Sequence, residues 1–290
     1  MTAGLTMTIK KTLLAALAIA AGFTIAAPAF AQEHETPHIE RQPWSFAGIF
    51  GTYDEHQLQR GFQVFREVCS GCHAARLLHF RNLSEEGGPH FSEGQVKELA
   101  AQYDIADPDA EGGTRKGIPA DVWPAQMSDA DAVATFGIVP PDFSTLAKAR
   151  GVTDPFPLWV FNYFTAYQEG GPDYIHALLN SYHEEVPPTA PEGFTLPDGK
   201  HYNDVFPGHA ISMPPPLSDG QVTYTAEEGQ AEVPQTVEQY SEDVSAFMAW
   251  LADPHMASRK ESGFRVILFL FLLAGLMYFT KTRVWKGIEH

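Results

Sequence analysis

The chain has 290 residues, and its 36 acidic residues outnumber its 19 lysines and arginines, which gives a net charge of −17 at pH 7. Such an acidic chain is a poor binder of nucleic acid and a plausible partner for a basic protein. No internal repeats are visible, and the length allows one large domain or one domain with insertions.

The N-terminus has the pattern of a bacterial secretory signal peptide. Lys10 and Lys11 precede an apolar run over residues 12–27, and Ala29-Phe30-Ala31 has the small-x-small spacing of a cleavage site. We therefore expect residues 1–31 to be removed and the rest of the chain to be exported to the periplasm. A permanent N-terminal anchor is the alternative, which the shortness of the run and its cleavage site disfavour.

A helix is predicted over residues 54–69, because apolar side chains recur there at steps of three and four: Leu58, Phe62, Phe65 and Val68. It leads into the sequence Cys69-Ser70-Gly71-Cys72-His73, which holds both cysteines of the chain. Cys-x-x-Cys-His is the attachment signature of c-type haem. Each cysteine sulfur adds across a haem vinyl group, and the histidine is then held under the iron. One covalently attached haem c is therefore the predicted cofactor.

The two cysteines have three other interpretations. A structural disulfide between Cys69 and Cys72 explains the even number of cysteines but leaves His73 without a role. A thioredoxin-like redox pair needs a strand–helix context, whereas these cysteines end a helix. A structural zinc site needs further cysteine or histidine ligands at finger-like spacing, and the chain has no second cysteine pair.

Residues 186–216 are rich in proline and are predicted to form no long helix or strand. Met213 lies in this segment and is the favoured second axial ligand. A thioether raises the reduction potential of a haem, and neighbouring prolines stiffen the loop that presents it. The residues left as competitors are His183, His201, His209 and Met127.

Two helices are predicted near the C-terminus. Apolar residues between 237 and 251 follow helical spacing, and Pro254 ends that helix. Residues 263–280 are apolar and, with their flanks, reach the length of a membrane span. We expect a transmembrane anchor over residues 259–284, a short cytoplasmic tail over 285–290, and a periplasmic domain over 32–258. A buried core helix is the alternative for the anchor, disfavoured because the run is apolar all round.

Several segments, taken in order, resemble the cytochrome c1 family in its α-proteobacterial form. They are QLQRGFQVFREVCSGCH, PPDFSTLAKARG, GGPDYIHALLNSY, AISMPPPL, and DVSAFMAWLADPHMASRKESGF followed by the span. The first motif occurs in many unrelated cytochromes, but the ordered set covers nearly the whole mature chain and is specific. The resemblance implies a mostly α, cytochrome c-like haem domain with long irregular insertions and one C-terminal transmembrane helix.

The resemblance also implies roles for single residues. Cys69 and Cys72 attach the haem, His73 and Met213 ligate its iron, and Arg150 pairs with a haem propionate. Some bacterial relatives brace the methionine side with a disulfide. This chain has no cysteine to spare for one, so packing and prolines must hold that side.

The function implied is that of the haem c subunit of the cytochrome bc1 complex in the bacterial inner membrane. Such a subunit accepts electrons from the Rieske iron–sulfur protein and passes them to a soluble cytochrome c. It binds cytochrome b in a dimeric, membrane-embedded complex, and it has no substrate-turnover site of its own. Possible acids for docking a basic cytochrome are Asp107, Asp109, Glu111, Glu169, Asp173, Glu184, Glu185, Glu227, Glu228 and Glu232.

Two other functions are compatible with the residues themselves. One is a membrane-tethered cytochrome c that serves an oxidase or a periplasmic dehydrogenase. The other is a redox or structural protein without haem, in which Cys69 and Cys72 form a disulfide.

Overall fold

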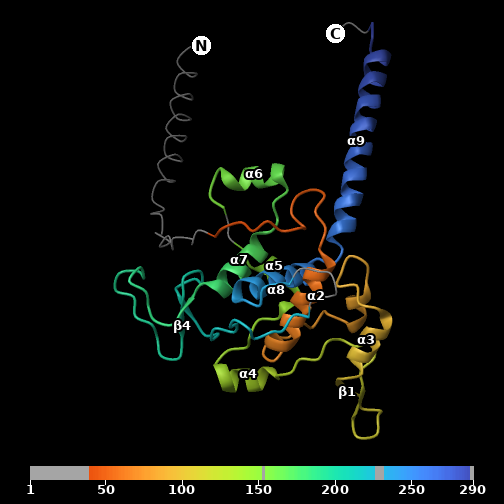
Figure 1. The fold of residues 1–290 in the computed structure, drawn as a ribbon. Helices are drawn as coiled ribbons and strands as arrows, with labels where there is room; N and C mark the ends of the chain where they lie inside the picture. The colour runs from red at the N-terminus through yellow and green to blue at the C-terminus, as the bar shows by residue number, and fades with distance from the viewer. Residues whose placement is uncertain (1–38, 152–153, 226–231, 288–290) are drawn as a thin grey trace, which may run out of the picture. The chain divides into compact units, whose positions relative to one another are not determined.

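A computed structural model describes residues 39–151, 154–225 and 232–287. The predicted signal peptide lies outside these residues. Helices dominate the described chain, and its strands are two or three residues long, which confirms the mostly α class (Figure 1). The helices not discussed individually below are α3 (Glu93–Ala100), α4 (Asp129–Phe136) and a 3-10 turn, η2 (Phe80–Ser84).

The helices α2 (Glu55–Val64) and α8 (Val237–Ala252) cross at the centre of the domain (Figure 1). Both helices were predicted, and both are confirmed. The crossing is close because Gly61 has no side chain: a Cβ atom there would lie 2.1 Å from the carbonyl oxygen of Asp243 and 2.7 Å from Phe247 Cβ. Glycine is therefore required at the contact, despite its cost within a helix.

The last turn of the predicted helix is a π-helix, η1 (Phe65–Cys69), rather than α-helix. The amide of Ser70 donates to the carbonyl of Phe65 at 2.8 Å, which is an i→i+5 bond. Single π-turns are rare and often occur at functional sites. Here the π-turn ends at the first residue of the Cys-x-x-Cys-His motif.

An aromatic cluster fills the core beside α2. Trp123 is 2% exposed, and its ring centroid lies 4.9–5.6 Å from those of its neighbours Phe62, Phe65, Phe80 and Tyr103. Ring pairs at such distances stabilise a core beyond the area they bury. The cluster joins α2 and the π-turn to η2 and to the loop before α4.

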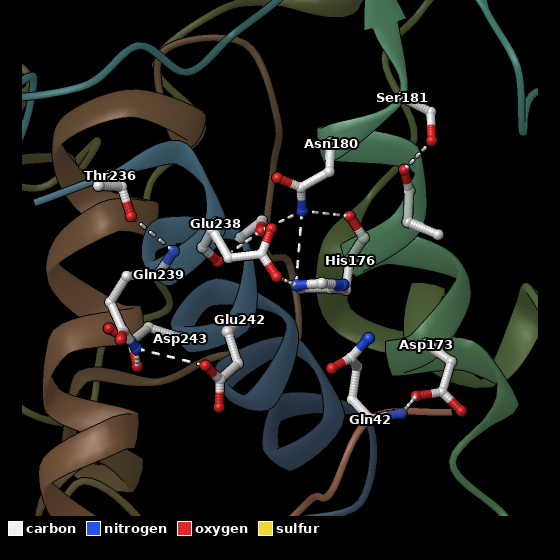
Figure 2. Close-up of polar contacts among 12 residues, drawn as sticks. Gln42, Asp173, His176, Asn180, Ser181, Thr236, Glu238, Gln239, Glu242 and Asp243 are labelled. Atoms are coloured by element: carbon white, nitrogen blue, oxygen red, sulfur yellow. Dashed lines mark hydrogen bonds and ion pairs between the residues drawn. The ribbon is translucent and has the colours of Figure 1, made fainter. Parts of the chain in front are cut away.

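Helix α7 (Gly170–Asn180) packs on α8 through a polar interface (Figure 2). The side-chain amide of Asn180 donates to Ser241 Oγ at 2.6 Å, and His176 Nε2 lies 3.4 Å from a carboxylate oxygen of Glu238. Because His176 is 5% exposed, these contacts satisfy polar groups that would otherwise be buried without partners.

The other face of α7 rests on the short helix α5 (Leu146–Ala149), which follows the 3-10 turn η3 (Phe143–Thr145). A Cβ atom at Gly171 would lie 1.6 Å from the carbonyl oxygen of Ala147, so only glycine permits this approach. The contact fixes α5 against the centre of the domain.

Two small sheets complete the domain. Strands β1 (Asp104–Ala106) and β2 (Thr114–Lys116) form an antiparallel hairpin. Strands β3 (Tyr182–His183), β4 (His201–Asn203) and β5 (Ala210–Ile211) form an antiparallel sheet in that order. The proline-rich segment therefore contains only β4 and β5 as regular structure, as its composition predicts.

The final helix, α9 (Met256–Val284), begins before the predicted start of the anchor at residue 259. Its first turns belong to the domain: Met256 is 6% exposed, and Lys260 Nζ donates to the carbonyl of Phe46 at 2.7 Å. Beyond Val266 the apolar side chains are exposed, and the helix is long and apolar enough to cross a membrane. The predicted transmembrane helix is confirmed in this sense.

Candidate functional site

The Cys-x-x-Cys-His motif forms a tight turn at the end of the π-helix. The carbonyl of Cys69 accepts hydrogen bonds from the amides of Cys72, at 3.1 Å, and His73, at 2.9 Å. Both thiols are free, with Cys69 half-buried and Cys72 exposed. Burial, followed by the neighbouring Cys72, raises the pKa of the Cys69 thiol to about 12. A redox-active cysteine needs a lowered pKa, so this environment disfavours a thioredoxin-like pair.

The imidazole of His73 is oriented by a backbone carbonyl. Its Nδ1 lies 2.8 Å from the carbonyl oxygen of Pro141, and its ring centroid lies 4.4 Å from that of Phe143. A carbonyl only accepts, so Nδ1 carries the proton and Nε2 of the neutral ring keeps its lone pair. Burial lowers the pKa of His73 despite the opposing effects of Pro141 and Asp142, which favours the neutral ring.

These groups fit the attachment of a haem. Two free sulfurs and a neutral imidazole lie within one turn, and the Pro141 carbonyl holds the imidazole in the way that a hydrogen-bond acceptor commonly orients a metal-binding histidine. The zinc reading gains no support, because the described residues contain no group of three or more histidine, cysteine, aspartate or glutamate side chains that could hold a metal ion.

The segment around Pro141 is fastened to the motif along its length. The amide of Phe143 donates to the carbonyl of Ala74 at 2.8 Å, and the amide of Arg76 donates to Asp142 Oδ2 at 3.0 Å. A third bond runs from the amide of Leu77 to Ser144 Oγ at 3.0 Å. The chain then continues through η3 and α5, so the motif and Arg150 are joined by one short, well-supported segment.

Arg150 ends α5, where its amide donates to the carbonyl of Leu146 at 2.9 Å. Its guanidinium is exposed, and within the described part of the chain no hydrogen bond or ion pair engages it. Burial raises the pKa of the Tyr174 hydroxyl, and the positive charge of Arg150 partly offsets this rise. Arg150 therefore lies close to the α7 tyrosine and is available to an anionic group.

Met213 is half-buried and lies two residues after β5. The hydroxyl of Tyr182 donates to its carbonyl at 3.2 Å, and Lys200 Nζ donates to the adjacent Ser212 Oγ at 2.5 Å. Burial, then the neighbouring Tyr174, raises the pKa of Tyr182, so its hydroxyl stays a donor. Two side chains thus fix the backbone of the loop and leave the thioether of Met213 uncommitted.

The predicted residues form two groups with a common neighbour. Cys69, Cys72 and His73 share one turn, whereas Met213 is held by Tyr182 just after α7, and Arg150 ends α5, which packs on α7. Among the described hydrogen bonds, none joins His73 directly to Met213. The segment from Pro141 to Arg150 connects the two groups, because it contacts His73 at one end and α7 at the other.

Two of the three histidines that compete with Met213 have other partners. His183 Nε2 lies 2.6 Å from Asp204 Oδ2, and His209 Nδ1 lies 3.2 Å from the carbonyl of Asn203. The ring of His209 also stacks on Tyr202, with centroids 5.6 Å apart. These contacts give both histidines structural roles, and they favour Met213 as the candidate ligand.

Two of the possible docking acids are buried. Glu169 is 4% exposed and Asp173 is 1% exposed. Asp173 accepts hydrogen bonds from Trp44 Nε1 at 2.7 Å and from the Tyr167 hydroxyl at 2.5 Å. It also accepts one from the backbone amide of Gln42 (Figure 2). A protein partner cannot reach them, so the expectation was wrong for this pair. Glu184 and Glu185 are exposed directly after β3, whereas Glu227 and Glu228 lie outside the described residues.

Sequence reasoning missed the residues that support the candidate ligands. Pro141 lies 68 positions from His73, and Tyr182 lies 31 positions from Met213. No local sequence pattern predicts these contacts, because they depend on how segments far apart in the chain pack together. The Pro140-Pro141-Asp142 segment carried a family resemblance, but its contact with His73 is visible only in the fold.

Comparison with known proteins places the chain in a family. The model of the cytochrome C1 family matches residues 44–288. The chain is 43% identical to the cytochrome c1 of Blastochloris viridis, over 98% of this chain and 99% of the relative. It is 37% identical to "Cytochrome c1-2, heme protein, mitochondrial" of Solanum tuberosum, over 92% and 93%. It is 50% identical to the longer "Cytochrome b/c1" of Bradyrhizobium diazoefficiens, over 83% of this chain but 35% of that protein. The resemblance found in the sequence is thus confirmed, and the chain belongs to the cytochrome c1 family.

Proposed function

We propose that this chain is a membrane-anchored c-type cytochrome that transfers electrons within a cytochrome bc1 complex. Membership of the cytochrome c1 family, the Solanum relative named as a haem protein, and the length and apolar character of α9 support this role. The observation that carries it is the His73–Pro141 contact, because it leaves Nε2 of a neutral imidazole available directly after two free cysteines.

One haem c is held by this chain. Cys69 and Cys72 would attach it through two thioether bonds, and His73 would bind the iron through Nε2. When bound, the haem supplies a reversible one-electron change at its iron. The polypeptide keeps that group in place, because covalent attachment prevents its loss from an exported protein.

Met213 would hold the iron together with His73, and Arg150 would pair with a haem propionate. The Tyr182 hydroxyl and the Lys200–Ser212 contact hold the loop that presents Met213, which supports its assignment over the engaged histidines. The exposed guanidinium of Arg150, without an anionic partner in the described chain, supports its role toward a carboxylate.

Electrons reach this chain from the Rieske iron–sulfur protein and leave to a soluble cytochrome c. Cytochrome b is the partner in the membrane, within a dimeric complex, as the joint name of the Bradyrhizobium relative supports. The signal-peptide pattern supports a periplasmic domain, with α9 as a single-pass anchor in the inner membrane. The excess of acidic over basic residues speeds the encounter with a basic cytochrome and makes it sensitive to salt.

Loss of haem attachment tests the proposal. Wild-type protein should keep a haem stain on a denaturing gel, whereas Cys69→Ala with Cys72→Ala should lose it. Met127→Leu is the matched control and should keep the stain, because Met127 takes no part in attachment. Haem that acid acetone extracts fully from the wild-type chain contradicts the proposal.

Purification in mild detergent tests the assembly. Recovery of the chain with two b haems and a Rieske cluster supports the bc1 complex. Recovery alone, or with a copper oxidase, supports instead a tethered cytochrome c that serves another enzyme. The gel stain and the copurification are independent measurements. The proposed haem attachment and the proposed bc1 assembly can therefore be contradicted separately.

A further inference from the structure

Helix α6 (Leu158–Thr165) is apolar and has no buried residue. Its exposed side chains are large: Phe164 is 77% exposed, Tyr163 80% and Phe161 56%, and Phe156 just before it is 78% exposed. No residue between Asp154 and Glu169 carries a charge. A soluble domain rarely exposes such a run of aromatic side chains, so this helix has a partner that covers it.

The segment is held to the domain by its polar residues. Arg41 Nη2 donates to Asp154 Oδ2 at 2.8 Å and to Asn162 Oδ1 at 2.9 Å, and Asn162 donates to Asp154 at 2.7 Å. The guanidinium of Arg41 also lies 3.7 Å from the ring centroid of Tyr167. Asn162 therefore faces the domain, and the aromatic side chains of α6 are presented outward on a fixed support.

The segment lies next to the start of the membrane anchor. One short stretch of chain joins α6 to the start of the anchor: Arg41 donates to Asn162 Oδ1 on α6, and the carbonyl of Phe46 accepts from Lys260 Nζ at 2.7 Å. Lys260 is on α9, less than two turns before the apolar run that begins at Val266. Figure 1 shows α6 on the side of the domain toward which the apolar part of α9 extends.

A second aromatic contact marks the same level of the anchor. Phe50 is 75% exposed, and its ring centroid lies 5.4 Å from that of Phe264, at the entry to the apolar run. Exposed aromatic side chains thus occur both on α6 and on the loop that touches the first apolar turn of α9. Tryptophan and tyrosine are enriched at the membrane–water interface, where the apolar ring contacts lipid and the polar group contacts the headgroups and water.

We propose that α6 lies in the interfacial region of the lipid bilayer, in the leaflet through which α9 enters, as a second membrane contact of this chain. Its aromatic side chains insert among the lipid headgroups and upper acyl chains, with Asn162 and Arg41 on the protein side. This contact fixes the orientation of the domain on the membrane, which a single helix through the bilayer does not do alone.

Lipid is favoured over a protein partner by composition and position. The helix offers Trp159 and Tyr163 on one side, and the nearest acids are not free to bind a partner: Asp154 pairs with Arg41 of this chain, and Glu169 is buried. A protein interface of this kind commonly has a polar rim, and α6 has no charged rim of its own. Short helices rich in tryptophan and phenylalanine on one face lie in the membrane interface plane.

The test uses the full chain in nanodiscs of phosphatidylcholine and phosphatidylglycerol, one chain to a disc. A phosphatidylcholine with a diazirine near the headgroup end of its acyl chain is photolysed, and mass spectrometry locates the adducts. We expect adducts on residues 156–164 and on the apolar run of α9. Helix α4 is the internal control and should carry none, although its Val133 is 51% exposed.

A variant and a second preparation complete the design. Trp159→Ser with Phe161→Ser and Phe164→Ser should abolish the α6 adducts and leave those on α9 unchanged. Absence of α6 adducts in the wild-type chain overturns the proposal in favour of a water-exposed helix. Adducts in nanodiscs that vanish in the purified membrane complex also overturn it, because protein then covers α6. Neither reading depends on haem or on electron transfer.

Discussion

Arg60 on α2 and Asp243 on α8 form a two-point ion pair at the crossing of the two helices. Arg60 Nε lies 2.9 Å from Asp243 Oδ2, and Nη2 lies 2.9 Å from Oδ1. The carboxylate is fully buried, and the Tyr224 hydroxyl also donates to it at 2.9 Å. The helices that position the candidate haem site are thus fixed by a charge pair one residue from the close contact at Gly61.

Arg60→Ala should destabilise the domain by about 3 kcal/mol, because it leaves a buried carboxylate without its charge partner. Thermal unfolding of the haem-loaded chain in detergent, followed by circular dichroism, measures the effect. Arg76→Ala is the matched control: its pair with Asp129 is more than half exposed, so we expect a loss below about 1 kcal/mol. Equal losses in the two variants contradict this account of the crossing.

Asp253 predicts a pH dependence at the junction of α8 and α9. Burial acts to raise the pKa of its carboxyl, but hydrogen bonds from Lys148 at 2.6 Å and Arg259 at 2.5 Å outweigh burial, and the pKa is lowered. A carboxyl with a depressed folded-state pKa contributes stability above its unfolded pKa of about 3.9 and loses it as pH falls through the folded value.

Asp253→Asn should therefore cost about 1 kcal/mol at neutral pH and flatten the fall in stability below about pH 4. The measurement is a series of unfolding temperatures between neutral and acidic pH. Asp104→Asn serves as the control, since Asp104 forms an exposed ion pair with Lys116 at the open end of the β1–β2 hairpin. If the unfolding temperature of Asp253→Asn falls with acid as steeply as that of the wild-type chain, protonation of Asp253 does not cause the loss of stability.

Met213→Leu should leave the haem attached but lower its reduction potential. Thioether ligation stabilises the ferrous form, and its loss removes that bias. A fall of about 60 mV already costs about tenfold in a one-electron transfer equilibrium. A redox titration and the weak sulfur–iron charge-transfer band of the ferric spectrum provide the readings. Met127→Leu should change neither; if Met213→Leu also changes neither, Met213 is not the ligand.

Tyr182→Phe tests the support of the Met213 loop. The substitution removes the 3.2 Å hydrogen bond to the Met213 carbonyl and should weaken the loop by about 1 kcal/mol. We expect the charge-transfer band to disappear at a lower guanidinium concentration, while covalent attachment through Cys69 and Cys72 is unchanged. Tyr163→Phe, at an 80% exposed position, is the control. A band that survives to the wild-type concentration assigns Tyr182 no positioning role.

The residues that would bind the haem could be predicted from the sequence, but the residues that hold them in position could not. Cys69, Cys72 and His73 are adjacent in the chain, so their spacing alone indicates haem attachment. Met213 could be favoured from its proline-rich loop and the family resemblance. The Pro141 carbonyl that orients His73 and the Tyr182 hydroxyl that holds Met213 come from distant segments. Glu169 and Asp173 looked like surface acids because burial cannot be inferred from residue type alone.

The sequence by itself determined the elements whose signals are local. Helical spacing predicted α2 and α8, the apolar run predicted the spanning part of α9, and proline content predicted the irregular segment before Met213. Tertiary structure alone decided the π-turn at Phe65–Cys69, the docking of the first turns of α9 through Met256, and the outward face of α6. The sequence of an apolar helix does not show whether protein or lipid covers it. Hydrophobicity shows only that burial away from water is favourable, whatever the apolar surroundings are.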